Sequence, residues 1–172
     1  MSFSPSGRYF SVCGDTDFVV YQYPKFSNAA FGNGSGLVWA SVNASQNIFA
    51  IKGANNQIKI YKNLQEFNAF NVGFPVEQIF GGVLLAVKSK EFITFYDWET
   101  QVLVRRIDVS PAPKNVYWSD NGQQVILALE ENYYLLSFDS DQVANYISSK
   151  EPSDLVDKPA EDEDDDGFED AF

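Results

Sequence analysis

Residues 95–109 read F-Y-D-W-E-T-Q-V-L-V-R-R-I-D-V, an apolar run that holds an Asp-Trp pair and an Arg-Arg pair. An acid beside an indole, followed by two bases, is one arrangement that a functional site could have. The same residues also fit the end of one strand, a turn at 99–101 and a second strand. The choice between a site and a scaffold depends on whether this pattern recurs along the chain.

The pattern occurs four times, at a period of about 40 residues. Each segment contains a short strand, a turn, an apolar strand, a polar turn and a strand that closes on an aromatic residue. The apolar strands, such as V-L-L-A-V at 83–87, do not alternate, as expected of strands that are covered on both faces. These observations predict an all-β chain of about four consecutive WD40-type β-propeller blades. The closing aromatic residues are Tyr21, Tyr61, Tyr96 and Phe138.

The repeat assigns a place to the stretch at 95–109. Tyr96-Asp97 falls where the Trp-Asp dipeptide ends the third strand of a WD blade, and residues 102–109 become the fourth, outermost strand. The fourth unit lacks a clear outer strand, and four blades do not close a propeller of the usual size. We therefore expect an incomplete propeller over residues 1–147, with exposed edges that promote self-association of the isolated chain.

Residues 148–172 have a different composition, and we predict a disordered acidic insert or tail. The net charge of the chain is −12, and 11 of its 24 acidic residues lie within 151–172. Such a run of like charge with few apolar residues favours disorder. Phe168 and Phe172 suggest one alternative, a docking segment in which the two rings act as anchors.

The acidic run also contains Asp162, Asp164 and Asp166 followed by Gly167, the opening pattern of an EF-hand loop. The Glu expected at the twelfth position would fall beyond residue 172, and no amphipathic helix precedes the run. Acidic runs produce this pattern by chance, so we predict no calcium site here.

Composition excludes several classes of function. The chain has no His and one Cys, which excludes a Cys-His nucleophile and a thiolate zinc site. We predict no catalytic residue, no cofactor and no metal. The nearly neutral body argues against nucleic acid as a partner. No apolar segment is long enough to span a bilayer and no signal peptide is visible, so we expect a soluble cytosolic protein.

The other residues that suggest a site have simpler interpretations. Asp97-Trp98 is best explained as a blade landmark capped by a turn. Arg105 and Arg106 are consecutive in a strand, so their side chains point to opposite faces and form no single basic patch. Lys88 and Lys90 are expected at a loop surface. The side chain of Cys13 is expected to be a small buried hydrophobe in an apolar strand.

An ordered series of unusual stretches carries a family resemblance. The chain resembles the second propeller of the β′ subunit family of the COPI coatomer along essentially its whole length. The resemblance rests on N-Q-I-K-I-Y-K-N (56–63), I-F-G-G-V-L-L-A-V (79–87), F-Y-D-W-E-T-Q-V-L-V-R-R-I (95–107), Y-W-S-D-N-G (117–122) and E-D-A-F (169–172).

The resemblance implies a non-enzymatic scaffold of the COPI vesicle coat, which supports Golgi-to-ER retrograde and intra-Golgi transport. It implies other coatomer subunits as partners, α-COP first among them, and a peripheral location on the cytoplasmic side of Golgi and vesicle membranes. In this family dilysine cargo tails are read by the first propeller, so no cargo-binding residue is assigned here. The alternative is a cytosolic WD-repeat adaptor unrelated to coatomer.

Overall fold

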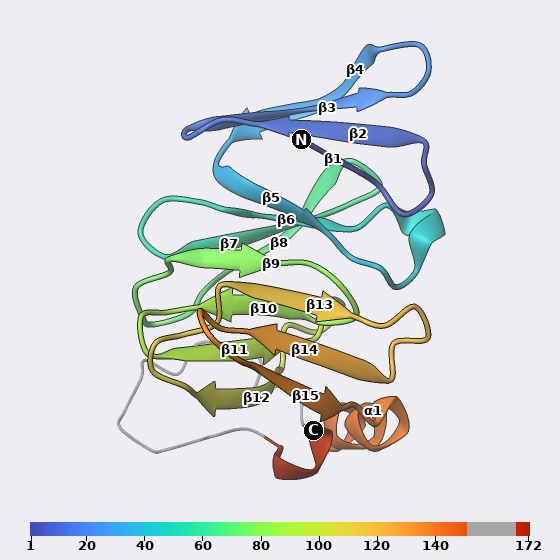
Figure 1. Ribbon diagram of the computed structural model, residues 1–172. Helices are drawn as coiled ribbons and strands as arrows, with labels where there is room; N and C mark the ends of the chain where they lie inside the picture. The colour runs from blue at the N-terminus through green and yellow to red at the C-terminus, as the bar shows by residue number, and fades with distance from the viewer. Residues whose placement is uncertain (151–167) are drawn as a thin grey trace.

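The structure of the chain, a computed structural model, describes residues 1–150 and 168–172, and β-strands are its main secondary structure. The strands form four antiparallel sheets, and each sheet is built from strands that are consecutive in sequence. The sheets lie side by side in chain order, from the N-terminal sheet to the sheet that precedes the helix α1 (Figure 1). The predicted all-β fold of four propeller blades is confirmed.

The first three blades have four strands each, and the fourth has three strands among the described residues, as the sequence predicted. Within each blade the strands pair in chain order, so the first and last strands are the edges. Their bounds are β1 (Ser2–Phe3), β2 (Tyr9–Cys13), β3 (Asp17–Gln22) and β4 (Ser27–Asn33) in blade 1; β5 (Ser35–Trp39), β6 (Phe49–Lys52), β7 (Gln57–Lys62) and β8 (Gln65–Asn71) in blade 2; β9 (Gln78–Phe80), β10 (Leu85–Lys88), β11 (Phe92–Tyr96) and β12 (Leu103–Asp108) in blade 3; β13 (Asn115–Trp118), β14 (Gln124–Ala128) and β15 (Tyr133–Ser137) in blade 4.

The hydrophobic core lies between the blades rather than within them. One cluster joins blades 1 and 2, a second joins blades 2 and 3, and a third joins blades 3 and 4. Because successive side chains of a strand point to opposite faces, β6 supplies Phe49 and Ile51 to the first cluster and Ala50 to the second. This sharing explains why the inner strands are apolar on both faces.

Two adjacent glycines allow three blades to approach closely. A Cβ atom on Gly81 would collide with the backbone carbonyl of Trp39 in blade 2. A Cβ atom on Gly82 would enter the indole ring of Trp118 in blade 4, and Gly82 also has a φ of 125° that favours glycine. The Gly82 N–H donates to the Trp39 carbonyl at 3.2 Å, and the Ser41 N–H donates to the Gly82 carbonyl at 2.9 Å.

The closing aromatic residues share a backbone irregularity. In blades 1, 2 and 3 the pairing between the third and fourth strands shifts register immediately before Tyr21, Tyr61 and Tyr96. Such a bulge increases the local twist and redirects the neighbouring side chains. Tyr61 stacks on Phe49 with ring centroids 4.8 Å apart, and Tyr96 contacts Phe70 at 5.3 Å across the boundary between blades 2 and 3.

A helix follows the last strand, and the repeat pattern did not reveal it. Helix α1 (Ser140–Ser149) begins after Asp139, whose carboxylate accepts hydrogen bonds from the N–H groups of Asp141 and Gln142 at 3.1 Å. Val143 is buried against blade 4 and Ile147 packs beside it. The other helical turns in the described residues are the short 3-10 segments η1 (Ala44–Gln46) and η3 (Glu169–Ala171).

The end of the chain differs from the predicted disorder. Residues 168–172 lie against α1 and β12, where the Phe168 N–H donates to the Val104 carbonyl at 2.7 Å. The Phe168 ring stacks on Tyr146 with centroids 4.7 Å apart, and Ala171 is fully buried. Apolar contact therefore overrides the acidic composition in these five residues. The prediction of disorder for 151–167 concerns residues outside those that the structure describes.

Candidate functional site

Asp97 and Trp98 lie in the turn between β11 and β12, which begins directly after Tyr96 and so two residues before the turn predicted at 99–101. One carboxylate oxygen of Asp97 accepts hydrogen bonds from the Thr100 N–H and hydroxyl, both at 2.8 Å, and from the Glu99 N–H at 3.1 Å. The Trp98 indole is 2% exposed and donates to the Gly82 carbonyl at 3.0 Å. The Asp97 carboxylate therefore caps the turn, and the buried Trp98 indole packs the turn against the core.

Arg105 and Arg106 point to opposite faces of β12 and have different surroundings. Arg106 binds Asp108 at 3.1 Å and lies over the ring of Phe92, 4.0 Å from its centroid. Arg105 lines a pocket between blades 3 and 4, and among residues 1–150 and 168–172 its buried Nη1 atom has no hydrogen-bond partner. Local pairing therefore explains Arg106 but not Arg105, a distinction that the sequence did not predict.

The two lysines at and just beyond the end of β10 also differ from each other. Lys90 is exposed, as expected of a loop residue. Lys88 ends the strand, and its largely covered ammonium group lies 3.9 Å from the carboxylate of Glu77. The Glu77 N–H donates to the Lys88 carbonyl at 2.9 Å, so this lysine belongs to the junction of β9 and β10 rather than to a loop surface.

Cys13 is half-buried at the end of β2 and packs against the cluster between blades 1 and 2. Its burial is thus less complete than predicted. The EF-hand-like residues 162–167 lie outside the described part of the chain. Among residues 1–150 and 168–172, no group of three or more acidic or Cys side chains is placed to hold a metal ion.

A polar contact between blades 2 and 3 was missed by sequence reasoning. The Lys62 ammonium lies 2.9 Å from the Glu99 carboxylate, and the Asn43 side-chain amide donates to the same carboxylate at 3.3 Å. Lys62 ends β7 and Glu99 lies in the turn of the next blade. The equivalence of these turns in the repeat was the signal that could have suggested the contact.

Within the described part of the chain, the four groups with shifted pKa values give no sign of acid-base catalysis. Burial raises the pKa of Tyr96 to about 12. Burial, then the neighbouring Glu66, raises the pKa of Tyr61. The Lys114 ammonium lowers the pKa of Glu130, and the N–H of Gln142 lowers that of Asp139. Each shift moves the group further from neutral pH, so none of the four is poised for proton transfer there.

Comparison with known proteins decides the family. The sequence profile of the family described as "COPA/B second beta-propeller" matches residues 1–172. The chain belongs to this coatomer propeller family. The strands, turns and inter-blade clusters described above are therefore those of a coatomer second propeller, in agreement with the resemblance in the sequence.

Individual relatives within the coatomer family cover nearly all of the chain. It is 40% identical over 146 residues to the "Probable coatomer subunit beta'" of Schizosaccharomyces pombe, which covers 85% of this chain and 18% of the relative. It is 38% identical to the coatomer subunit beta' of Drosophila melanogaster and 36% identical to that of Homo sapiens. Each of these two comparisons covers 98% of this chain and 17% of the relative. The chain thus spans about a sixth of the length of these relatives.

A solved structure supports the fold alone. Hydrazine synthase of Kuenenia stuttgartiensis superposes with a TM-score of 0.60 over 78% of this chain and 44% of that chain, at 15% sequence identity.

No helix within residues 1–150 and 168–172 has the length and apolar character needed to cross a bilayer.

Proposed function

We propose that this chain is a structural scaffold segment of the COPI vesicle coat and acts through protein–protein contacts rather than catalysis. The match of the coatomer second-propeller family to residues 1–172 carries the proposal. The named relatives are β′ subunits of coatomer. The role in Golgi-to-ER retrograde and intra-Golgi transport follows from that assignment.

The finer parts of the proposal concern partners and place. Other coatomer subunits are the proposed partners, with the α subunit first, and the chain associates with Golgi and COPI vesicle membranes peripherally, on their cytoplasmic side. The packing of the chain suits this role, because three apolar clusters and the Lys62–Glu99 ion pair hold neighbouring blades together. A fixed arc of blades presents its loops in a constant arrangement to other subunits. No observation favours the alternative of an adaptor outside coatomer.

A chimera in fission yeast tests the proposal. The matching segment of the S. pombe β′ subunit is replaced with this chain, and the chimera is purified through a tag on the subunit. We expect the α subunit to co-purify in equal amount and the tag to mark Golgi membranes.

The Gly82→Ala chimera serves as the control for a disrupted propeller, since a Cβ atom there collides with Trp118. A chimera that resists proteolysis as well as the parent subunit, yet purifies without the α subunit, would refute the scaffold role. If the chimera loses both the α subunit and its protease resistance, its behaviour is compared with that of the Gly82→Ala chimera, in which the propeller itself is disrupted.

A further inference from the structure

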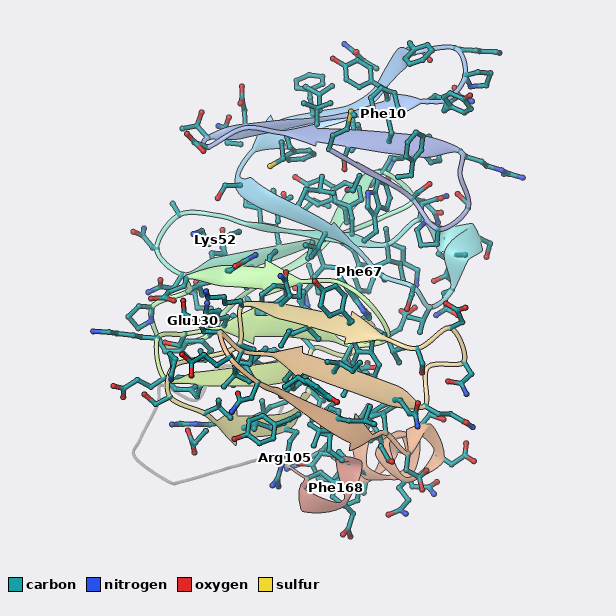
Figure 2. All side chains as sticks on the ribbon, viewed as in Figure 1. Phe10, Lys52, Phe67, Arg105, Glu130 and Phe168 are labelled. Carbon is teal, nitrogen blue, oxygen red and sulfur yellow. The ribbon has the colours of Figure 1, made fainter. Side chains whose placement is uncertain are left out.

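Residues 168–172, which read F-E-D-A-F, form a short segment that is called the latch below. The latch lies against α1 and β12, at the end of the molecule that also carries α1 (Figure 2). Two backbone hydrogen bonds join it to the rest of the described chain. The Phe168 N–H donates to the Val104 carbonyl at 2.7 Å, and the Asp139 N–H donates to the Ala171 carbonyl at 3.4 Å. The latch therefore connects the outer strand of blade 3 with the residue that caps α1.

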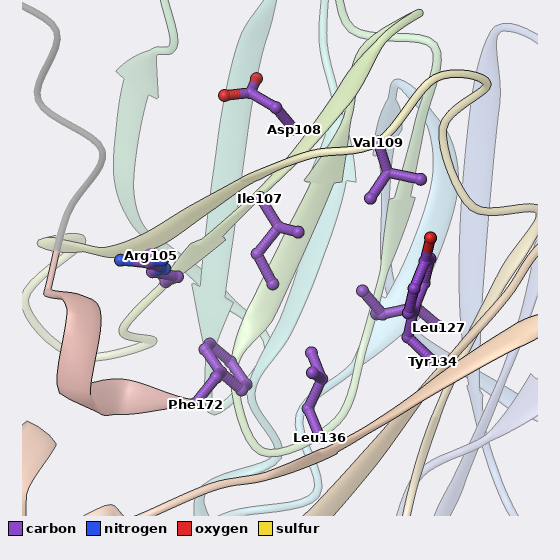
Figure 3. Close-up of a pocket in the computed structure, with 8 residues that line it drawn as sticks. All are labelled: Arg105, Ile107, Asp108, Val109, Leu127, Tyr134, Leu136 and Phe172. Atoms are coloured by element: carbon purple, nitrogen blue, oxygen red, sulfur yellow. The ribbon is translucent and has the colours of Figure 1, made fainter.

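Aromatic rings at the two ends of the latch supply most of its side-chain contacts. The Phe168 ring stacks on Tyr146 of α1, with the ring planes 7° apart. The Phe172 ring lies 5.0 Å from Phe95 and 5.5 Å from Phe138, measured between centroids. It also closes one end of the pocket between blades 3 and 4 (Figure 3). The attraction that holds the latch is thus concentrated in a few side chains.

The blades and α1 have their own pairing without the latch. No latch residue belongs to any of the four sheets, and β15 pairs with β14 along its whole length. Helix α1 is capped by the Asp139 side chain and packs on blade 4 through Val143 and Ile147. Undocking would break two backbone hydrogen bonds and separate the rings. It would leave every strand ladder and the helix intact.

The free-energy balance also favours opening of the latch before opening of the blades. Docking orders five residues, and the lost conformational entropy of each residue opposes it. The gain comes from two partly buried Phe rings and the small buried side chain of Ala171. Blade 4 is held instead by strand ladders and by a large apolar cluster. Segments with few buried contacts open at lower free energy than core strands.

We propose that residues 168–172 are a reversible latch, which undocks from α1 and β12 while the four blades stay folded. The docked state is the one in the structure, and the undocked state is a minor population of the same chain. Docking holds both ends of the acidic run at 151–167 beside blades 3 and 4, and undocking releases one end. The latch is a conformational switch that goes beyond the scaffold role and does not depend on the assignment to coatomer.

Two neighbouring amides distinguish opening of the latch from opening of the blade. The Asp139 N–H donates to the latch carbonyl of Ala171, whereas the Phe138 N–H donates to the Gln123 carbonyl within blade 4 at 2.8 Å. In native-state hydrogen exchange of the 172-residue chain, we expect the opening equilibrium at Asp139 to be at least about tenfold larger than at Phe138. Low concentrations of urea should increase opening at Phe138 more steeply, because opening of a blade exposes more surface.

Two results of this experiment would overturn the proposal. Equal opening at both amides, with the same dependence on urea, would mean that the latch and blade 4 open as one unit. An Asp139 amide that exchanges without any protection would mean that the latch does not dock.

Matched variants assign the opening to the latch. Phe168→Ala removes the stack on Tyr146 and should increase opening at Asp139 about tenfold, the effect expected for loss of an aromatic pair. Opening at Phe138 should stay unchanged. Asp170→Ala changes an exposed residue of the same segment and should alter neither amide. If Phe168→Ala increased opening at both amides equally, the segment would be an integral part of blade 4 rather than a latch.

A double variant tests the contact itself. Tyr146→Ala should increase opening at Asp139 as Phe168→Ala does, and the two changes together should have little more effect than either alone, because both remove the same stack. Fully additive effects would refute the role of this contact in docking.

Dilution distinguishes docking within one chain from exchange between two copies. Protection of the Asp139 amide should not depend on protein concentration, because the latch binds its own chain. Protection that decreases on dilution would place the latch on a second copy and refute the switch as proposed.

Discussion

The tight contact at Gly81 and Gly82 makes a prediction about how the blades are held together. Three glycine-to-alanine variants separate backbone conformation from packing. Gly7 has a φ of 68° and open space where a Cβ atom would lie. Gly81 has no positive φ, but a Cβ atom there meets the Trp39 carbonyl. Gly82 combines a positive φ with a collision against the Trp118 indole.

The expected costs follow from these three environments. Gly7→Ala should cost about 1–2 kcal/mol, the penalty for a side chain in the left-handed region. Gly81→Ala should cost about 3 kcal/mol, the upper part of the usual range for overpacking, because a backbone carbonyl cannot move aside. Gly82→Ala should cost about 3–5 kcal/mol, since backbone strain and overpacking both apply.

Native-state hydrogen exchange measures these costs locally, even if global unfolding is not cooperative. The amide of Ser41, which donates to the Gly82 carbonyl, reports on the junction of blades 2 and 3. We expect its opening free energy to fall strongly in the Gly81 and Gly82 variants and little in the Gly7 variant. If all three variants changed it equally, close packing would not be the reason for the glycine pair.

Three further predictions concern other parts of the molecule. Phe172→Ala should lower the free energy of local opening of blade 4 by about 2 kcal/mol, less than for a fully buried Phe, while Phe31→Ala at a 77% exposed position should change it by less than about 0.5 kcal/mol in the same hydrogen-exchange experiment. Because burial raises the pKa of Tyr96, the contribution of this residue to stability is constant below pH 10 and is lost as pH rises from 10 to about 12, by about 2–3 kcal/mol relative to Tyr96→Phe in alkaline denaturation. The isolated chain should self-associate or fold partially, so light scattering should show growth with concentration, and a sharp cooperative unfolding of a monomer would contradict this.

The sequence predicted the blades because their pattern is local and repeated. The opposite faces of Arg105 and Arg106 follow from strand geometry alone. A turn after the third strand was also predicted, although it begins at Asp97 rather than at residue 99. The packing role of the glycine pair depends on Trp39 and Trp118, which approach only when the blades stack. Contacts between distant segments cannot be read from a local pattern.

The sequence reasoning missed several features, for different reasons. Helix α1 has a visible signal, an Asp cap before apolar residues spaced four apart, but the repeat of strands dominated the interpretation. The packing of Phe168 and Phe172 was outweighed by the acidic composition of the residues around them. The unpaired Nη1 atom of Arg105 had no sequence signal, because hydrogen-bond satisfaction is a property of the folded arrangement.

The position of the core clusters has a consequence for how such a chain can grow. Each cluster belongs to the boundary between two sheets, so four sheets give three clusters. A sheet added at either end would create one new boundary and leave the existing boundaries intact, whereas removal of an inner sheet would destroy two at once. In an array where each unit contacts only its neighbours, stability is a sum over junctions. Gene duplication at the ends is therefore far better tolerated than deletion from the middle.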